Sequence, residues 1–195
     1  MRVIIVTPTY LEADNIVEFL TRARAAAPDA DILVVDDNSP DGTADLAEQA
    51  AVDLGQIEVL RRPRKIGLGD AYRAGFTVGL ERGYDIVVQI DADLSHDPAA
   101  LPNLIQAVVD GADVAIGSRY VRGGAIPHWP WHRRALSKWG NRYTALLLGM
   151  PISDATSGYR VYRAEMIKSV GYDTTRAKGY GFQIELAYRV NQNGG

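Results

Sequence analysis

The chain has 195 residues, of which 47% are hydrophobic, with 21 Lys and Arg against 24 Asp and Glu and no Cys. This length suffices for one domain with a sizeable core, and the absence of Cys excludes a disulfide scaffold, a thiolate zinc site, an iron–sulfur cluster and a Cys nucleophile. No stretch reaches the ~18 uninterrupted apolar residues that a membrane-spanning helix needs. We therefore expect an intracellular protein that does not cross a membrane.

Up to residue 117, short β-branched runs alternate with longer segments of helical period, which predicts βα units that build a parallel sheet. Strands are predicted at residues 2–7, 31–35, 58–61, 85–90 and 113–117, and helices at 15–27, 43–54, 69–82 and 98–110. The glycines, prolines and aromatic residues at 122–131 then predict an ordered loop. A helix at 134–148, a strand-like run at 159–162 and helices near 164–169 and 183–191 are predicted to follow.

Charge is segregated along the chain, although the net charge is only −3. Residues 29–58 hold nine acidic residues and no Lys or Arg, whereas residues 117–153 hold six Lys or Arg, no acidic residue and all three Trp. The two segments are therefore expected to meet partners of different character. Within the basic segment, Trp129 and Trp131 beside Arg133 fit either anchoring at lipid headgroups or the closing of a small core.

Acidic side chains follow the first, second and fourth predicted strands, and an arginine follows the fifth. These residues are Glu12, Asp36, Asp37, Asp91, Asp93 and Arg119. Ligands bind at the carboxyl ends of parallel strands, so we expect these side chains to face one crevice. Carboxylates gathered there repel one another unless a cation is bound, and hard oxygen ligands suit Mg²⁺ or Mn²⁺. The pattern indicates a metal–nucleotide site with Arg119 facing a phosphate, whereas a single Asp after a strand can also merely cap the next helix.

Competing motifs fail on spacing. The run from Asp91 to Asp97 resembles the start of an EF-hand loop, but its sixth position is His96 instead of Gly and its twelfth is Pro102 instead of Glu. A dinucleotide-binding fingerprint at residues 67–72 would need a third Gly where this chain has Tyr72. The sequence also contains no phosphate-binding loop of the G-x-x-x-x-G-K-[ST] type and no G-x-S-x-G nucleophile elbow.

Longer motifs extend over almost the whole chain. They are T-P-T-Y-L-E-A-D-N-I at 7–16, V-V-D-D-N-S-P-D-G-T at 34–43, G-L-G-D-A-Y-R-A-G at 67–75, D-A-D-L-S-H at 91–96, G-S-R-Y at 117–120, W-P-W-H-R-R-A-L-S-K at 129–138, S-G-Y-R-V-Y-R at 157–163 and G-Y-G-F-Q-I-E-L at 179–186. In this order they resemble the motifs of family 2 inverting glycosyltransferases with the GT-A fold. The resemblance is to polyprenyl- and dolichyl-phosphate mannosyltransferases in particular.

The resemblance implies a role for each matching residue. The guanine and ribose of GDP-mannose would lie against Pro8, Tyr10, Glu12, Val35 and Asp37, and the ribose, diphosphate and metal against Asp91, Ala92 and Asp93. The metal, Mg²⁺ or Mn²⁺, would be held by Asp93 with Ser95. Arg119, Arg133 and Ser137 would receive the acceptor phosphate, and Asp91, Asp93 and Arg119 would form the catalytic set.

The resemblance also implies an α/β fold with a mostly parallel, Rossmann-like central sheet flanked by helices. We expect residues 1–195 to form a single catalytic domain, with residues 1–118 binding the nucleotide sugar and residues 119–195 binding the acceptor, truncated at the C-terminal end. The expected partners are GDP-mannose, a polyprenyl or dolichyl phosphate and the cytoplasmic face of a membrane with its embedded proteins, but no nucleic acid. Glucosyl transfer from UDP-glucose, a sugar nucleotidyltransferase and a non-catalytic donor-binding module are the alternatives.

Overall fold

The computed structural model describes residues 1–118, 139, 149, 154–177 and 179–195. Its strands are β1 (Val3–Thr9), β2 (Asp31–Asp36), β3 (Ile57–Arg61), β4 (Ile86–Gln89), β5 (Val114–Ile116) and β6 (Arg160–Arg163). Its α-helices are α1 (Ile16–Ala26), α2 (Thr43–Leu54), α3 (Leu68–Glu81), α4 (Leu101–Val109), α6 (Ala164–Ser169) and α7 (Tyr180–Gln192). Two 3₁₀ turns, η1 (Pro98–Ala100) and η2 (Tyr172–Thr174), complete the described elements.

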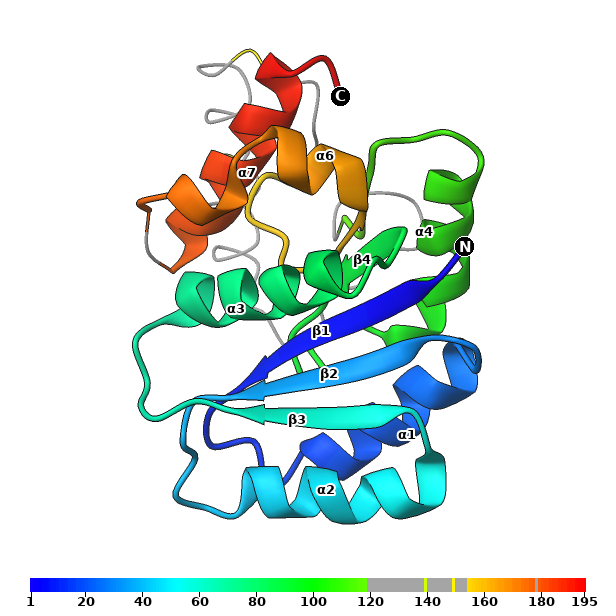
Figure 1. Cartoon of the computed structure of the whole chain (residues 1–195), viewed down its shortest axis with the longest axis vertical. Helices are drawn as coiled ribbons and strands as arrows, with labels where there is room; N and C mark the ends of the chain where they lie inside the picture. The colour runs from blue at the N-terminus through cyan, green and yellow to red at the C-terminus, as the bar shows by residue number, and fades with distance from the viewer. Residues whose placement is uncertain (119–138, 140–148, 150–153, 178) are drawn as a thin grey trace.

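The strands form one six-stranded sheet in the order β3-β2-β1-β4-β6-β5, in which Figure 1 labels β1 to β4. β3, β2, β1 and β4 are parallel neighbours, and β6 is antiparallel to both β4 and β5. β5 therefore points the same way as the first four strands. The carboxyl ends of five strands consequently lie at the same edge of the sheet, which is the edge that binds ligands in parallel α/β folds.

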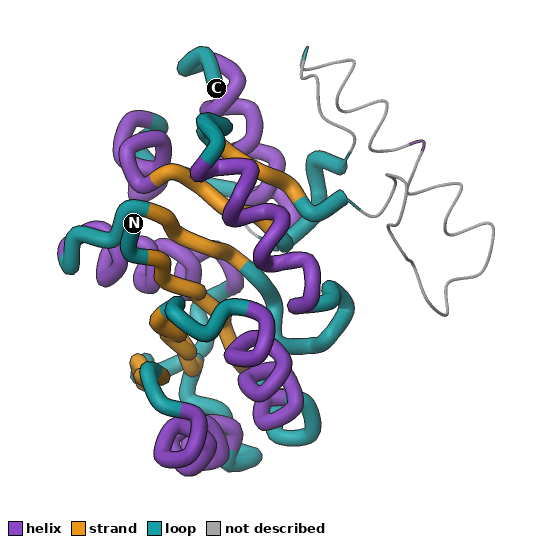
Figure 2. Tube along the Cα trace, turned by 90° about the vertical axis from the view of Figure 1, so that its right-hand side faces the viewer, coloured by secondary structure: helices purple, strands orange, loops and turns teal. Residues whose placement is uncertain are grey.

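Helices cover both faces of the sheet, as Figures 1 and 2 show. One face packs on α1, α2 and α4 through a core that includes Ile16, Phe19 and Leu101. The other face packs on α3, α6 and α7 through a core that includes Phe76 and Phe182. Covering both faces explains why the central strands are continuous apolar runs instead of alternating patterns.

The sequence-based elements within the described residues are confirmed. Each predicted strand and helix occurs within a few residues of its expected bounds, including α7, which begins before the expected start of its helix at residue 183. At the start of the α4 region, the Asp97 side chain accepts a hydrogen bond from the Ala99 amide at 3.0 Å, and Pro98 occupies the first position of η1. The loop predicted at 122–131 and the helix predicted at 134–148 lie outside the described residues.

Helix α3 packs closely on the sheet because small residues face it. Gly75 lies directly over Val6 of β1, where an added Cβ atom would stand 2.2 Å from the Val6 Cγ1 atom. One turn later, Gly79 faces Ile4, with 3.1 Å from an added Cβ to the Ile4 Cγ2 atom. This close packing fixes α3 against β1, and the N-terminal turn of α3 reaches the ligand-binding edge of the sheet.

Candidate functional site

A cleft of about 370 Å³ lies at the carboxyl edge of the sheet. Its walls come from the segments that follow β1, β2, β3 and β4, together with the first turns of α3 and the start of α7. The lining residues are Pro8, Thr9, Tyr10, Glu12, Asp37, Lys65, Leu68, Ala71, Asp91, Ala92, Asp93 and Gly179. The cleft therefore lies where a doubly wound sheet binds its ligands.

Asp36, at the end of β2, forms part of the framework of the cleft. It is only 1% exposed, and its carboxylate accepts hydrogen bonds from the Thr9 hydroxyl at 2.9 Å, the Ser39 hydroxyl at 2.6 Å and the Ser39 amide at 2.9 Å. A carboxylate that accepts several hydrogen bonds in this way is held in one orientation. Asp36 thus joins the end of β1 to the turn after β2.

The same turn holds the loop that follows β1. The Leu11 amide donates to the Ser39 hydroxyl at 3.2 Å, the Glu12 amide to the Thr43 hydroxyl at 3.0 Å and the Ala13 amide to the Asp41 carboxylate at 3.1 Å. The N-S-P-D-G-T segment therefore supplies partners for backbone groups more than twenty-five residues earlier in the chain. Its polar side chains shape the cleft, and Asp37 is the one acidic side chain of this turn that lines it.

Asp37 faces a cationic wall that follows β3. Its Oδ1 atom lies 2.7 Å from Nη1 of Arg62, in an ion pair whose side chains are 6% and 11% exposed, respectively. Burial raises the pKa of Asp37, and Arg62 offsets this only in part. Next along this wall, the Lys65 ammonium lies 3.8 Å from the centre of the Tyr10 ring, at cation–π distance. This end of the cleft thus offers a carboxylate, a cation and an aromatic face.

Asp91 and Asp93 line the opposite end, after β4. The pKa of Asp91 is raised to about 6. Burial is the largest cause, the hydrogen bond from Tyr72 lowers the pKa, and the negative charges of Asp93 and Glu12 raise it. Asp93 is exposed and accepts a hydrogen bond from the Ser95 amide at 3.0 Å. Among the residues that the structure describes, neither Asp91 nor Asp93 forms an ion pair. These carboxylates therefore leave negative charge at the β4 end of the cleft.

Of the four segments that follow β1, β2, β3 and β4, three contain a residue with a left-handed backbone. Leu11 after β1, Asn38 after β2 and Leu94 after β4 have positive φ angles of 63°, 59° and 57°. A left-handed backbone is costly for residues other than Gly, and it persists where surrounding contacts impose it. At Leu11, the hydrogen bond from its amide to the Ser39 hydroxyl helps to hold this conformation.

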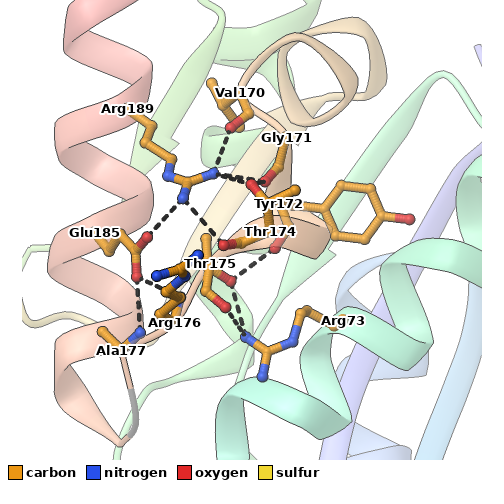
Figure 3. A network of polar contacts seen from close by, with 10 residues as sticks. All are labelled: Arg73, Val170, Gly171, Tyr172, Thr174, Thr175, Arg176, Ala177, Glu185 and Arg189. Atoms are coloured by element: carbon orange, nitrogen blue, oxygen red, sulfur yellow. Dashed lines mark hydrogen bonds and ion pairs between the residues drawn. The ribbon is translucent and has the colours of Figure 1, made fainter.

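The start of α7 closes the cleft through Gly179, and a polar network anchors the segment before it (Figure 3). Glu185 of α7 accepts hydrogen bonds from the Arg176 and Ala177 amides at 2.9 and 2.8 Å and pairs with Arg189 at 2.7 Å. Arg189 in turn donates to the Gly171 carbonyl at 2.7 Å. Glu185 is therefore engaged within the framework, and its contacts fix residues 170–177 against α7.

Most of the residues predicted to hold the donor come together in this cleft. Pro8, Tyr10, Glu12, Asp37, Asp91, Ala92 and Asp93 all line it. Val35 does not, because its side chain is fully buried against α3 in the core. Ser95 is exposed and contributes its backbone amide to Asp93. Arg119, Arg133 and Ser137 lie outside the described residues.

The residues near the cleft that received no role from the sequence include Arg62, Lys65 and Tyr72. The signal for the first two was present, because the basic run R-P-R-K at 62–65 directly follows the third predicted strand, whose carboxyl end shares the ligand-binding edge. Tyr72 lies within a recognised motif, but nothing local in the sequence indicates its contact with a residue nineteen positions later.

Comparison with known proteins agrees with this architecture. The family described as glycosyl transferase family 2 matches residues 4–171. The chain belongs to this family. It is 48% identical over 194 residues to polyprenol monophosphomannose synthase of Mycolicibacterium smegmatis, covering 99% of the chain and 73% of that relative. It is 47% identical over 194 residues to undecaprenyl-phosphate mannosyltransferase of Micrococcus luteus, covering 100% of the chain and 79% of that relative.

Solved structures with low sequence identity to this chain show the same fold. Glucosyl-3-phosphoglycerate synthase from Mycobacterium tuberculosis, crystallised with Mn²⁺, UDP-glucose and phosphoglyceric acid, matches with a TM-score of 0.67 and 22% identity over 95% of this chain and 63% of its own. A mannosyltransferase from Pyrobaculum calidifontis in complex with GDP-Man and Mn²⁺ matches with a TM-score of 0.61 and 19% identity, over 87% of this chain and 46% of its own. The predicted GT-A glycosyltransferase fold is thereby confirmed.

The side chains of the cleft fit a divalent cation. Asp91 and Asp93 offer hard carboxylate oxygens, while the described part of the chain holds no cluster of three or more His, Cys, Asp or Glu that would enclose a metal. Such a sparse donor set suits Mg²⁺ or Mn²⁺, which keep water ligands and share the phosphates of a substrate.

The described residues also include no helix that is long and apolar enough to span a bilayer.

Proposed function

We propose that this family 2 glycosyltransferase transfers mannose from GDP-mannose to a polyprenyl phosphate, with inversion at the anomeric carbon. The observation that carries the proposal is the near-complete match, at 48% and 47% identity, to a polyprenol monophosphomannose synthase and an undecaprenyl-phosphate mannosyltransferase. The cleft supports it because the residues that the resemblance assigns to the donor meet there, apart from Val35.

The strand order supports one direction for the donor in the cleft. The end of the cleft toward β3 carries Asp37 after β2 and Lys65 after β3, and the Tyr10 ring from the segment after β1 lies against Lys65; these groups suit a nucleobase and its ribose. The wall after β4 carries Asp91 and Asp93, which suit the diphosphate through a shared cation. GDP-mannose would thus lie across the edge of the sheet, with its guanine toward β3 and its mannose toward β4 and the acceptor.

The proposed reaction requires no strong general base. The acceptor phosphate is already ionised at neutral pH, so one of its oxygens can attack the anomeric carbon directly as the bond to the diphosphate breaks, which inverts the configuration. A divalent cation held by Asp93, and in the proposal also by Ser95, would stabilise the negative charge that develops on the leaving diphosphate. Arg119, Arg133 and Ser137 are proposed to hold the acceptor phosphate in line with that bond.

The lipid acceptor also gives the proposed location. A polyprenyl chain remains in a bilayer while its phosphate lies at the surface, so the enzyme has to work at a membrane surface, which we propose to be the cytoplasmic face. Trp129 and Trp131, beside the basic residues of the same segment, are the proposed contacts with lipid headgroups.

The test is transfer of labelled mannose from GDP-mannose into an organic-extractable product, with a short polyprenyl phosphate and with or without Mn²⁺ or Mg²⁺. Metal-dependent label in the organic phase supports the proposal. Asp93→Ala is expected to abolish transfer. Asp97→Asn removes the charge of another exposed aspartate in the same loop and its surface ion pair with Arg22, keeps the cap of η1 and is expected to retain activity.

Three results would contradict part or all of the proposal. Donor binding without transfer would refute the acceptor assignment and favour a donor-binding module. Label from UDP-glucose instead of GDP-mannose would refute the donor. Asp93→Ala activity within about 3-fold of the parent, a difference of less than about 1 kcal/mol in the barrier, would remove Asp93 from the site.

A further inference from the structure

Tyr72 of α3 carries a fully buried hydroxyl that reaches the donor cleft. The side chain is 0% exposed, and its hydroxyl donates a hydrogen bond to Oδ1 of Asp91 at 2.6 Å. A hydroxyl removed from water costs free energy unless it is partnered, and packing alone would be served equally by Phe. The hydroxyl therefore points to a function of this contact with Asp91.

The ring of Tyr72 is held between two other aromatic side chains. It lies parallel to Phe182 of α7, with 6.2 Å between ring centres and 4° between planes, and tilted against Phe76 at 5.8 Å. Gly69, one turn earlier on α3, admits the Phe182 ring, because an added Cβ would stand 3.1 Å from it. The direction of the Tyr72 hydroxyl is thus fixed by both α3 and α7.

Asp91 is confined from the other side by Gly158. An added Cβ at residue 158 would stand 2.6 Å from Oδ2 of Asp91, so this oxygen packs directly over the glycine backbone. One carboxylate oxygen is therefore held by Tyr72 and the other is packed against residue 158. A carboxylate held on both sides is preorganised for its ligand, because it loses little freedom on binding.

We propose that Tyr72 is a positioning residue that holds Asp91 in its donor-binding orientation, and that Phe182 aims the Tyr72 hydroxyl. The inference rests on the proposed function, since it assumes that Asp91 contacts the bound nucleotide sugar. It links α7 to the donor site through the Phe182–Tyr72–Asp91 series of contacts.

The test compares Tyr72→Phe with Tyr84→Phe. Tyr84 is a matched control, because it is also buried and donates to an aspartate, Asp31, at 2.7 Å, but it precedes β4, at the amino end of the strand. We would measure the dissociation constant for GDP-mannose with Mn²⁺, the KM and kcat of transfer, and thermal stability. Loss of a hydrogen bond to a carboxylate predicts about 10-fold weaker donor binding for Tyr72→Phe, and less than about 2-fold for Tyr84→Phe.

A second variant separates positioning from packing. Phe182→Leu keeps an apolar side chain but removes the ring stack, and it is expected to weaken donor binding by about 3-fold. In the Tyr72→Phe background the same change should leave donor affinity unaltered, because no hydroxyl remains to be aimed. A purely structural role would instead give additive losses in both backgrounds.

The proposal is overturned if Tyr72→Phe binds the donor within about 2-fold of the parent, or if Tyr84→Phe weakens binding equally. A parent protein that binds UDP-glucose instead of GDP-mannose overturns the proposed donor alone. The same variants measured with UDP-glucose then still decide the role of Tyr72, because Asp91 lies at the opposite end of the cleft from Asp37 and Lys65. A parent that binds neither nucleotide sugar refutes both proposals.

Discussion

The packing of α3 on β1 leads to a quantitative prediction for Gly75→Ala. An added Cβ at residue 75 would stand 2.2 Å from Cγ1 of Val6 and 3.2 Å from Cγ2 of Val35. Carbon atoms in contact lie about 3.5–4.0 Å apart, so the first distance has to increase by about 1.3 Å. β1 cannot yield by this amount, because it is paired on both sides with β2 and β4. The helix therefore has to move.

The expected cost follows from two opposing effects. Overpacking a core costs about 1–3 kcal/mol, and replacing Gly by Ala inside a helix returns about 1 kcal/mol. The severe contact at Gly75 places the first effect at the upper end of its range, which leaves a net loss of about 2 kcal/mol. Gly79→Ala gains the same helix propensity, but its added Cβ would lie 3.1 Å from Ile4, a much milder contact than the one at Gly75. Its free energy of unfolding should therefore change by no more than about 0.5 kcal/mol.

Urea unfolding followed by circular dichroism measures both variants under identical conditions. Gly75→Ala is expected to unfold at the lower urea concentration, with an unchanged slope. Val6→Ala should cost less stability in the Gly75→Ala background than in the parent, because it removes the atom that is struck. A Gly75→Ala variant as stable as Gly79→Ala would refute this account of how α3 is held.

Three further outcomes follow from contacts near the cleft. Gly158→Ala should weaken GDP-mannose binding by about 10-fold or more, measured by calorimetry, because the new methyl group displaces the Asp91 carboxylate. Ser39→Ala should lower the free energy of unfolding by about 1–2 kcal/mol in urea titrations, since the Asp36 carboxylate and the Leu11 amide both lose a partner. Burial tends to raise the pKa of Glu185, but hydrogen bonds from backbone amides and the charge of Arg189 lower it overall. The folded state then binds fewer protons than the unfolded state, so this stabilisation is present above the ordinary Glu pKa of about 4.3 and lost as the pH falls below it. The stability difference between parent and Glu185→Gln should accordingly shrink as the pH falls from about 5 to about 3.

Local pattern was sufficient to predict most elements of the fold. Runs such as V-I-I-V before T-P-T-Y, and the helical periods between them, predicted β1 to β5 and α1 to α4, because each βα unit is a local arrangement. The insertion of β6 between β4 and β5 was not predicted. Val161 pairs with Val88 and Ala115, which precede it by dozens of residues. The sequence of a four-residue strand does not indicate which strands it will pair with.

The sequence predicted the composition of the site better than the duties of its residues. Position after a strand indicated that Asp36, Asp37, Asp91 and Asp93 would gather at one edge, and they do. Position alone could not show that Asp36 and Asp37 have different roles: Asp36 holds Thr9 and the turn, whereas Asp37 lines the cleft. The difference depends on side-chain orientation at adjacent positions of a strand end, and that orientation is decided by hydrogen-bond partners from another segment.

Fewer carboxylates carry an unpaired negative charge into the cleft than the sequence suggests. Asp36 and Asp41 accept hydrogen bonds from Thr9 and Ala13 and from groups within the turn after β2, and Asp37 is paired with Arg62. In the described residues, the carboxylates that line the cleft without an ion pair are Glu12, Asp91 and Asp93. Burial raises the pKa of Asp91, and the negative charges of Asp93 and Glu12 also raise it, against the hydrogen bond from Tyr72 that lowers it. The cleft therefore has a cationic end after β3 and an anionic end after β4. A ligand that carries its own cation beside a diphosphate, with a neutral base at a distance, matches this polarity in one direction only.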